Sequence, residues 1–506
     1  SSFRANDQGY ITKYEPLDLW NESSGKLIRN IDIGSTRPSD IDWERAAIVS
    51  HINSRISLHS IMTGEERVSF LGVDDNDYVF VLPSGYYMGS SRGVKSLSWR
   101  MGSKLYDFDQ WDLQYNRPDK VLEQLGNTDP SLVQIYRKAY LKRLNKAGFT
   151  EDMFSSGWHT PVTTIRNSED FILSVTDKHK KLVVCLSDSL YKLDRFNVWV
   201  NDVPVAGKNG FSLRSENSGN LVRTVDLVLS AGRNKIQVSC TNEKGVESLK
   251  ELVEVNYLPA VEVRPDLYVI AMCVSNYRDP YFNLQYAVKD GRDIVSMFIA
   301  AQGEQTGYNR VFADTLFDSH ATREEFFLLK EKLLSTHVDD HVVLFISGHG
   351  LLNEEAEFYF ATSDVDFSKP EVRGISFDDM EYLMDSIPAR KKLIMMDACH
   401  SGEYDKDEDA EILSMRTANW QDSQLKGAVR EYDFGTKKGT IAHSGVNLKS
   451  SFQLMQELFA GLDKGTGTIA ISAAAGRGYA LESAEWNNGV FTYSIINGLK
   501  NRAADK

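Results

Sequence analysis

Short runs in which apolar and polar residues alternate dominate the first part of the chain. Two of them span 55–64 (RISLHSIMTG) and 74–89 (DDNDYVFVLPSGYYMG), with Gly, Asn and Asp at the breaks. Strict alternation is typical of a half-buried strand, and Gly, Asn and Asp favour tight turns. The pattern therefore predicts an all-β region over residues 1–103.

A connector separates this region from a second region of alternating runs. Residues 104–160 are predicted to form a connector with a helix at 130–147, which contains a run of basic residues: Arg137, Lys138, Lys142, Arg143 and Lys146. A binding stripe and a solvated helix face would both give such a run, and the solvated face is the commoner origin. We therefore expect the helix to present these residues to solvent.

Residues 161–258 again alternate, with turn residues between the strands, and their length suits an immunoglobulin-like β-sandwich. Cys185, Trp199 and Cys240 follow the Cys…Trp…Cys order of immunoglobulin domains. The position two before Cys240 is Val238, where a corner tyrosine would stand. We therefore interpret the cysteines as two buried thiols, with a disulfide as the open alternative.

After Pro265 the chain changes to continuous apolar runs that alternate with helical segments. The runs are LYVIAMCVS (267–275), HVVLFIS (341–347), KKLIMMDA (391–398) and TIAISAAA (468–475). Apolar residues recur at helical spacing in 284–302, and a late helix is expected at 490–499. Strands that are apolar throughout are typical of a mostly parallel sheet with helices on both faces. Residues 266–506 are therefore predicted to be an α/β domain, which makes the chain multidomain.

Composition and charge narrow the classes of function. The formal net charge of −14 argues against a general nucleic-acid binder and against docking on an anionic membrane. The longest apolar run, Leu267–Val274, has eight residues, fewer than the roughly 20 that span a bilayer. Four cysteines are too few for a disulfide scaffold, and the polar start of the chain lacks a hydrophobic signal core. We therefore expect a cytoplasmic protein that binds neither nucleic acid nor membrane.

Two of the apolar runs end in residues that suit nucleophilic catalysis. One continues into Ser347-Gly348-His349-Gly350 and the other into Cys399-His400-Ser401-Gly402. Because parallel strands end at one edge of a sheet, loops after them would bring His349 and Cys399 together. An adjacent imidazole raises the thiolate fraction of a cysteine and can protonate a leaving amine. The sequence therefore predicts a Cys399 nucleophile and a His349 base, with the N–H groups of Gly350 and Cys399 as oxyanion donors.

The strand–SGHG and strand–DACHSG segments resemble the caspase/metacaspase family of cysteine peptidases. The resemblance covers residues 266–506, and the separation of 50 positions between His349 and Cys399 is similar to the caspase spacing. It implies that His349 acts as general base and acid, Cys399 as nucleophile and Gly350 as an oxyanion donor.

Two early segments resemble WD40-type propeller blades. Segments 17–33 (LDLWNESSGKLIRNIDI) and 56–71 (ISLHSIMTGEERVSFL) each have a strand, a polar turn with glycine and a second strand. Trp20 and the SSGK turn carry the likeness in the first segment. Propeller-like blades, a sandwich and a peptidase domain form an order similar to that of bacterial caspase-like proteins with WD40 repeats.

The family resemblance also bears on the residue before the cleaved bond (P1). Animal caspases read an aspartate there with an arginine, and the matching position in this chain is Leu284. Metacaspases line the pocket with carboxylates, and the matching residues are Asp397, Asp290 and Glu482. A carboxylate that meets a substrate cation gains about 1.5–3 kcal/mol. The resemblance therefore implies cleavage after Arg or Lys, while an Asp-specific protease with Arg278 as its cation stays open.

An insert over about 403–450 follows the Cys399 strand. It opens with the acidic run EYDKDEDAE (403–411) and continues with basic residues: Arg416, Lys426, Arg430, Lys437 and Lys438. In the resembled family this region is often cut during maturation, so we expect a zymogen that cleaves itself after a basic residue. The acidic run lacks EF-hand spacing, so we expect no metal or other cofactor and leave calcium open.

A protein of another class stays open as well. A non-catalytic or dormant caspase-like scaffold would act through its β-domains, although loss of His349 or Cys399 would be its expected mark. For the peptidase we expect a protein or peptide substrate, and a regulatory protein that binds the β-domains.

Overall fold

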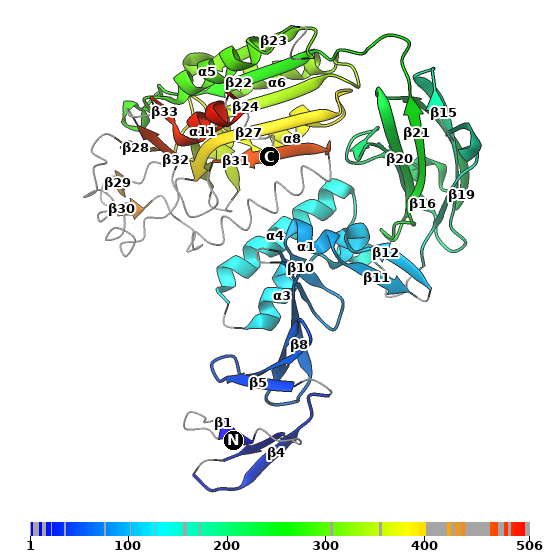
Figure 1. Ribbon diagram of the computed structural model, residues 1–506. Coiled ribbons are helices and arrows are strands. Elements are labelled where there is room, and N and C mark those ends of the chain that lie inside the picture. Colours follow the sequence, from blue (N-terminus) through cyan, green and yellow to red (C-terminus); the bar gives the residue numbers. More distant parts are fainter. Residues whose placement is uncertain are drawn as a thin grey trace. The chain divides into compact units, whose positions relative to one another are not determined.

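The computed structural model describes residues 2–3, 10–12, 17–21, 23–34, 37–74, 77–101, 103–126, 128–154, 159–171, 174–303, 307–353, 357–400, 423–426, 431–434, 437–440, 466–473, 480–483 and 487–500. The chain forms two compact units, shown as a ribbon in Figure 1: Ser1–His159 with Glu243–Glu247, and Thr160–Asn242 with Ser248–Lys506. Among the described residues, no helix has the length and apolar character to cross a membrane.

Antiparallel sheets form most of the first unit. One sheet has sequential order: β1 (Ser2–Phe3), β2 (Tyr10–Thr12), β3 (Leu17–Trp20) and β4 (Leu27–Ile31). A second sheet is a meander: β5 (Arg37–Asp42), β6 (Ala47–Ile52), β7 (Arg55–Ser60), β8 (Glu66–Gly72), β9 (Tyr78–Val81) and β10 (Tyr87–Gly89). A separate pair joins β11 (Ser98–Met101) to β12 (Lys104–Asp107). The predicted all-β region with several sheets is present, but these sheets do not establish a propeller.

The helices of the first unit follow the meander. They are α1 (Ser91–Lys95), η1 (Phe108–Trp111), α2 (Asp112–Tyr115), α3 (Pro118–Leu125), α4 (Pro130–Ala147) and η2 (Glu151–Met153). The N-cap carboxylate Asp129 accepts the N–H of Ser131, and Pro130 at the first helical position has no N–H to satisfy. Gly148 ends α4 in the left-handed conformation. These end signals confirm the helix predicted at 130–147.

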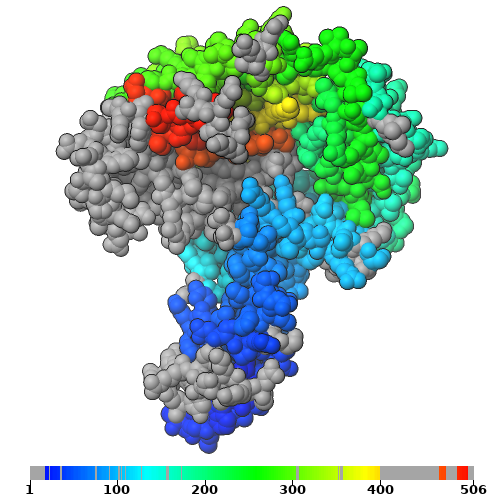
Figure 2. Space-filling model, in the orientation of Figure 1, coloured from blue at the N-terminus to red at the C-terminus, as the bar shows by residue number. Residues whose placement is uncertain are grey.

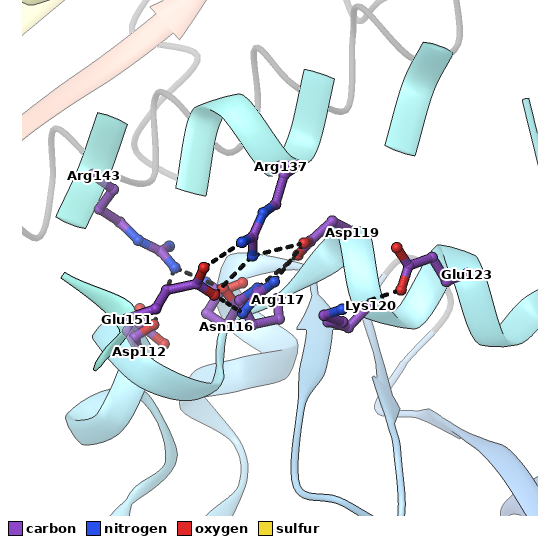
Figure 3. A network of polar contacts seen from close by, with 9 residues as sticks. All are labelled: Asp112, Asn116, Arg117, Asp119, Lys120, Glu123, Arg137, Arg143 and Glu151. Carbon is purple, nitrogen blue, oxygen red and sulfur yellow. Dashed lines mark hydrogen bonds and ion pairs between the residues drawn. The ribbon is translucent and has the colours of Figure 1, made fainter. Parts of the chain in front are cut away.

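A network of ion pairs corrects the prediction of a solvated basic face on α4 (Figure 3). The buried Arg117 guanidinium donates to Asp119 at 2.8 and 2.6 Å and to Glu151 at 2.8 Å. Arg137 of α4 donates to the same Glu151 carboxylate at 2.7 Å, and Arg143 donates to two backbone carbonyls. The lysines of the run are exposed, as predicted: Lys138, Lys142 and Lys146. The two arginines instead tie α4 to the rest of the unit.

The second unit begins with two β-sheets that share one core. The first sheet contains β13 (Val162–Ile165), β15 (His179–Ser187) and β19 (Asn220–Val228). The second contains β14 (Ser174–Val175), β21 (Glu251–Tyr257), β20 (Gly232–Asn242), β16 (Leu193–Val200), β17 (Val203–Pro204) and β18 (Phe211–Ser212). Short helices η3 (Ser168–Phe171) and η4 (Arg214–Glu216) complete the segment. In the space-filling view it forms one continuous body, coloured teal to green (Figure 2).

The marker residues of an immunoglobulin domain take other positions in this sandwich. Both neighbours of Trp199 in β16 are buried, so Trp199 faces away from the core, and Lys250 Nζ lies 5.2 Å from its ring. Cys185 is half-buried for the same reason, whereas Cys240 lies within the core. Neither cysteine forms a disulfide. The absence of a disulfide is as predicted, but only one of this pair is fully buried, and an immunoglobulin-like fold is not established.

A mostly parallel sheet forms the C-terminal region. Its parallel strands, in spatial order, are β23 (Val311–Phe317), β22 (Leu267–Cys273), β24 (His341–Leu352), β27 (Lys391–His400) and β31 (Thr468–Ser472). Two antiparallel strands extend from the end of β24: β25 (Phe358–Phe360) and β26 (Ile375–Ser376). Each apolar run of the sequence therefore coincides with all or part of one parallel strand, as predicted. The less apolar β23 was not predicted.

Helices cover both faces of this sheet (Figure 1). On one face, Ile346 packs in a core with residues of α6 (Arg323–Leu333) and α8 (Phe377–Met384). On the other, Phe345 packs with residues of α5 (Ala287–Ile299) and α11 (Val490–Lys500). The remaining elements are short: η5 (Pro280–Phe282), η6 (Asp318–His320), α7 (Pro370–Arg373), β28 (Ser423–Lys426), β29 (Glu431–Phe434), β30 (Lys437–Thr440), β32 (Ala480–Ser483) and β33 (Asn488–Gly489).

Candidate active site

The register of two central strands places His349 beside Cys399. In the parallel pair of β24 and β27, the Cα of His349 is the partner of the Cα of Cys399. Neighbouring strands lie about 4.8 Å apart, so the two backbones are in direct contact range. We predicted that both residues follow their strands in loops, and this was wrong. β24 continues to Leu352 because its last residues pair with β25, and the ladder with β27 continues beside it.

The imidazole of His349 is buried and held by a backbone carbonyl. Its side chain is 2% exposed, and Nε2 lies 2.8 Å from the carbonyl oxygen of Phe282. A carbonyl oxygen only accepts, so this hydrogen bond assigns the proton to Nε2 and makes Nδ1 the acceptor nitrogen of the neutral ring. The geometry therefore selects the tautomer in which Nδ1 can take a proton.

Aromatic rings surround this imidazole. Ring centroids of Tyr277, Phe367 and Phe282 lie 5.2, 6.0 and 6.2 Å from that of His349. The Phe282 and Phe367 rings stack on each other. Apolar rings on several sides limit the access of water to the base and fix the plane of the ring.

The glycines of the SGHG segment meet close neighbours. A Cβ on Gly348 would lie 2.8 Å from the Tyr277 hydroxyl oxygen and 3.0 Å from the Phe360 ring, so a side chain would displace both. Gly350 stands opposite His400 in β27 and opposite Phe360 in β25. Its role as an oxyanion donor remains a prediction.

Asp290 and Asp397 both contact the start of α11. Asp290 lies in the first turn of α5, is fully buried, and accepts hydrogen bonds from the Gly489 N–H at 2.9 Å and from Asn488 Nδ2 at 3.0 Å. Asp397 is equally buried and accepts from Thr492 Oγ1 at 3.3 Å. The N–H groups and dipole of a helix N-terminus favour negative charge. The structure thus brings two of the predicted pocket acids to one helix end.

The backbone of Glu482 also lies near the start of α11. In the antiparallel pair of β32 and β33, the Cα of Glu482 stands opposite that of Gly489, whose N–H binds Asp290. The side chains of Glu482 and Cys399 lie outside the described part of the structure.

Leu284 and Arg278 are the two positions that bear on recognition of an acidic P1 residue. Leu284 is 7% exposed and belongs to the hydrophobic core, so that position presents an apolar side chain. Arg278 is exposed in the loop after β22, where its N–H donates to the Ser363 carbonyl.

The insert at 403–450 is described only at 423–426, 431–434 and 437–440. The acidic run 403–411, where calcium was left open, lies outside the described residues, as do Arg416 and Arg430. Within the described part of the chain, no group of three or more His, Cys, Asp or Glu residues could hold a metal ion.

The sequence did not reveal the residues that contact and orient the predicted site residues. Phe282 acts through its carbonyl, which every residue has, so its identity gave no signal. Asn488 lies 198 positions from its partner Asp290, and Thr492 lies 95 positions from its partner Asp397, so only the packing of α11 shows these contacts. Tyr277 was detectable as a buried aromatic residue soon after a strand, but not as a partner of His349.

Comparisons with known proteins identify a family for the region that contains His349 and Cys399. Residues 268–506 match the family model described as the caspase domain, Peptidase_C14. No curated protein matches the chain.

Solved structures match the chain only weakly. The fibronectin(III)-like modules of Clostridium thermocellum CbhA are 16% identical, with 20% of this chain and 99% of theirs covered, at a TM-score of 0.15. The SrpA adhesin of Streptococcus sanguinis is 10% identical, with 30% and 80% covered, at 0.15. A 2,6-sialyltransferase of Photobacterium sp. JT-ISH-224 is 11% identical, with 49% and 43% covered, at 0.16. Scores this low assign no fold, and the assignment follows from the family model: the chain carries a caspase domain at residues 268–506, which supports a cysteine-type peptidase.

Proposed function

We propose that this chain is a cysteine endopeptidase that cleaves proteins or peptides after Arg or Lys. Cys399 is the nucleophile and His349 the base. The observation that supports this most directly is the pairing of His349 with Cys399 in adjacent parallel strands, with His349 Nε2 bound to the Phe282 carbonyl.

The proposed reaction follows from the tautomer of His349. Nδ1 accepts the proton of the Cys399 thiol, and the thiolate sulfur attacks the carbonyl carbon of the scissile bond. The N–H groups of Gly350 and Cys399 are proposed to stabilise the oxyanion of the tetrahedral intermediate. The imidazolium then protonates the leaving amine, which leaves a thioester on Cys399. Water, deprotonated by Nδ1, hydrolyses this thioester and restores the thiol.

Specificity for Arg or Lys is proposed from the acids that contact the start of α11. Asp397 stands two positions before Cys399 in β27, and Asp290 contacts the same helix end. Glu482 is proposed as the third acid of the pocket. A basic P1 side chain would gain a charge-assisted hydrogen bond there. The buried Leu284 gives no such support to a pocket for aspartate.

The test is hydrolysis of fluorogenic peptides that end in Arg, Lys or Asp. We expect turnover after Arg and Lys, which Cys399→Ala abolishes and Cys185→Ala, a cysteine of the sandwich, leaves unchanged. Turnover only after Asp would overturn the proposed roles of Asp397, Asp290 and Glu482. Absence of turnover together with absence of thiol reactivity at Cys399 would favour the non-catalytic scaffold instead.

Self-processing in the 403–450 insert is part of the proposal. Mass spectrometry of the chain before and after incubation should show cuts after basic residues of this insert, and none in Cys399→Ala. An intact chain in a fully active preparation would contradict it.

Catalysis is proposed to need no cofactor, because both groups that act on the peptide bond are side chains. Activity should persist in EDTA, and a requirement for added calcium would contradict this. A cytoplasmic location and a regulatory protein on the β-domains are also proposed, and the second predicts that a fragment lacking these domains responds to no such protein.

A further inference from the structure

The loop between β22 and α5 is closed on itself and fixed at its base. The Leu284 N–H donates to the Ser275 carbonyl at 2.9 Å, which joins the two ends of the loop. The Asp318 carboxylate accepts from the N–H groups of Ser275 and Asn276 at 2.8 Å each, and from Asn276 Nδ2 at 2.9 Å. These bonds attach the beginning of the loop to the end of β23, so the loop starts from a defined position.

Two groups of this loop reach His349 from different directions. The Phe282 carbonyl binds the ring at Nε2, 2.8 Å away. The Tyr277 hydroxyl oxygen accepts the backbone N–H of His349 at 2.9 Å, and the Tyr277 ring lies beside the imidazole. Tyr277 is 5% exposed, so this contact is made away from water. One contact thus fixes the main chain of the base, and the other fixes the rotation of its ring.

Asn283 connects the two contacts. Its Oδ1 accepts the N–H of Tyr277 at 2.8 Å, and it directly follows Phe282 in the chain. A change in the Asn283 side chain would therefore alter the spacing between the hydroxyl and the carbonyl that hold His349. Asn283 is exposed in the described structure, so its presence is not required to fill a core.

We propose that Tyr277 and Asn283 are positioning residues for the proposed catalytic base, and that they act by holding the loop that orients His349. This inference rests on the proposed function of His349. A displacement of about 1 Å in a catalytic group can cost about 100-fold in rate, so loss of one such bond is expected to lower turnover without altering substrate binding. The close approach of the Tyr277 hydroxyl to Gly348 supports the proposal, because this glycine leaves room for the hydroxyl.

The test combines kinetics with the pH dependence of alkylation of Cys399 by iodoacetamide. In the unmodified chain, Cys399 should react at a pH well below that of a free thiol, whose midpoint is about 8.5. Tyr277→Phe should shift this midpoint upward by at least about half a unit and lower kcat about 10-fold, with KM within about twofold. Tyr281→Phe, which removes a hydroxyl from the same loop, is the control and should change neither quantity.

A second pair of variants covers the case in which Tyr277→Phe does not fold. Asn283→Ala removes the acceptor for the Tyr277 N–H, whereas Asn283→Asp keeps an oxygen in its place. We expect Asn283→Ala to shift the alkylation profile and Asn283→Asp to restore most of the original profile.

The inference is overturned if Tyr277→Phe and Asn283→Ala fold and have the alkylation profile and kcat of Tyr281→Phe. Loss of thermal stability without a change in the profile would also overturn it, because that result marks a structural role only. If the unmodified chain hydrolyses no peptide but His349→Ala abolishes the low-pH alkylation of Cys399, the proposed specificity or activity fails. The alkylation profiles of the variants still decide the positioning role in that case.

Discussion

Charged side chains are buried in several regions of the described structure, and two of these regions offset the cost of burial in different ways. In the first unit, Arg117 and Asp119 are 3% and 1% exposed and pair directly, with Glu151 as a second partner of the arginine (Figure 3). In the caspase domain, Asp290 and Asp397 accept hydrogen bonds from uncharged groups at the start of α11. An ion pair that balances its own charge is typical of a structural element, whereas like charges in one place are typical of a site that receives a ligand. We therefore expect the first region to contribute to stability and the second to the recognition proposed above.

The largest effect is expected from breaking the ion pairs of the first unit. Burial disfavours the charge of Arg117, but its hydrogen bond with Asp119 keeps the pKa of the guanidinium above its ordinary value. Arg117→Met would leave Asp119 buried without this partner and should lower the free energy of unfolding of the first unit by about 3–5 kcal/mol. Chemical denaturation followed by tryptophan fluorescence measures this.

Lys120→Met is the matched control for Arg117→Met. Lys120 and Glu123 form an ion pair on α3, the helix that also contains Asp119, with side chains 40% and 48% exposed. Loss of this ion pair should lower the free energy of unfolding by less than about 1 kcal/mol. Equal effects of the two substitutions would remove the distinction between a structural buried network and a surface pair.

The second-largest effect concerns recognition of the P1 side chain of the substrate. Asp397→Asn should lower kcat/KM for a peptide with P1 Arg about 10- to 100-fold, while a peptide with the neutral isostere citrulline changes less than about threefold. Asp314→Asn, an acid paired with Lys332 at the edge strand β23, is the control and should leave both substrates unaffected. If Asp397→Asn lowers both substrates equally, the carboxylate does not read the P1 charge.

Loss of charge is a third response to burial, and it occurs at His341. Burial, assisted by the charge of Lys391, lowers the pKa of His341 to about 4. Its unfolded-state pKa is about 6.5, so the unfolded chain binds the extra proton between these values, and stability should fall as the pH falls through this window. We expect His341→Gln to reduce the loss of unfolding free energy between pH 7 and pH 4.5 by about 1–2 kcal/mol. An unchanged pH dependence in His341→Gln would contradict the neutral state of this histidine.

The smallest effect is expected at Thr492, where one substitution removes the hydroxyl and another keeps it. Thr492→Val keeps the volume but removes the donor to Asp397, which should lower kcat/KM for P1 Arg by about 3- to 10-fold. Thr492→Ser should recover most of that loss. Equal activities of Val and Ser at this position would show that the hydrogen bond has no part in recognition.

The central sheet could be predicted from the sequence because its strands are apolar throughout. The same pattern placed His349 and Cys399 at one edge of it. Their location within the strands was not predictable, since the length of β24 depends on its pairing with β25, which is formed by a later segment. The sequence also does not show that the Phe282 carbonyl orients His349, because a backbone group leaves no mark on residue type.

The errors elsewhere have similar physical origins. Trp199 follows the Cys…Trp…Cys order of immunoglobulin domains but faces away from the core, and a shift of one position along a strand is enough to turn a side chain to the opposite face. Arg137 and Arg143 were assigned to a solvated face because helical spacing alone does not reveal the acid and the carbonyls that approach from other segments. Asp290 is fully buried in α5 and contacts the start of α11, which the sequence does not reveal, and its part in a substrate pocket stays a prediction.

Covalent labelling tests the central claim most directly. The chain is incubated with peptidyl chloromethyl ketones that carry Arg or Asp at P1, and the modified residue is identified by mass spectrometry. We expect a single adduct on Cys399, formed faster with Arg than with Asp, and no adduct there in His349→Ala. An adduct on another cysteine, or faster labelling by the Asp reagent, would contradict it.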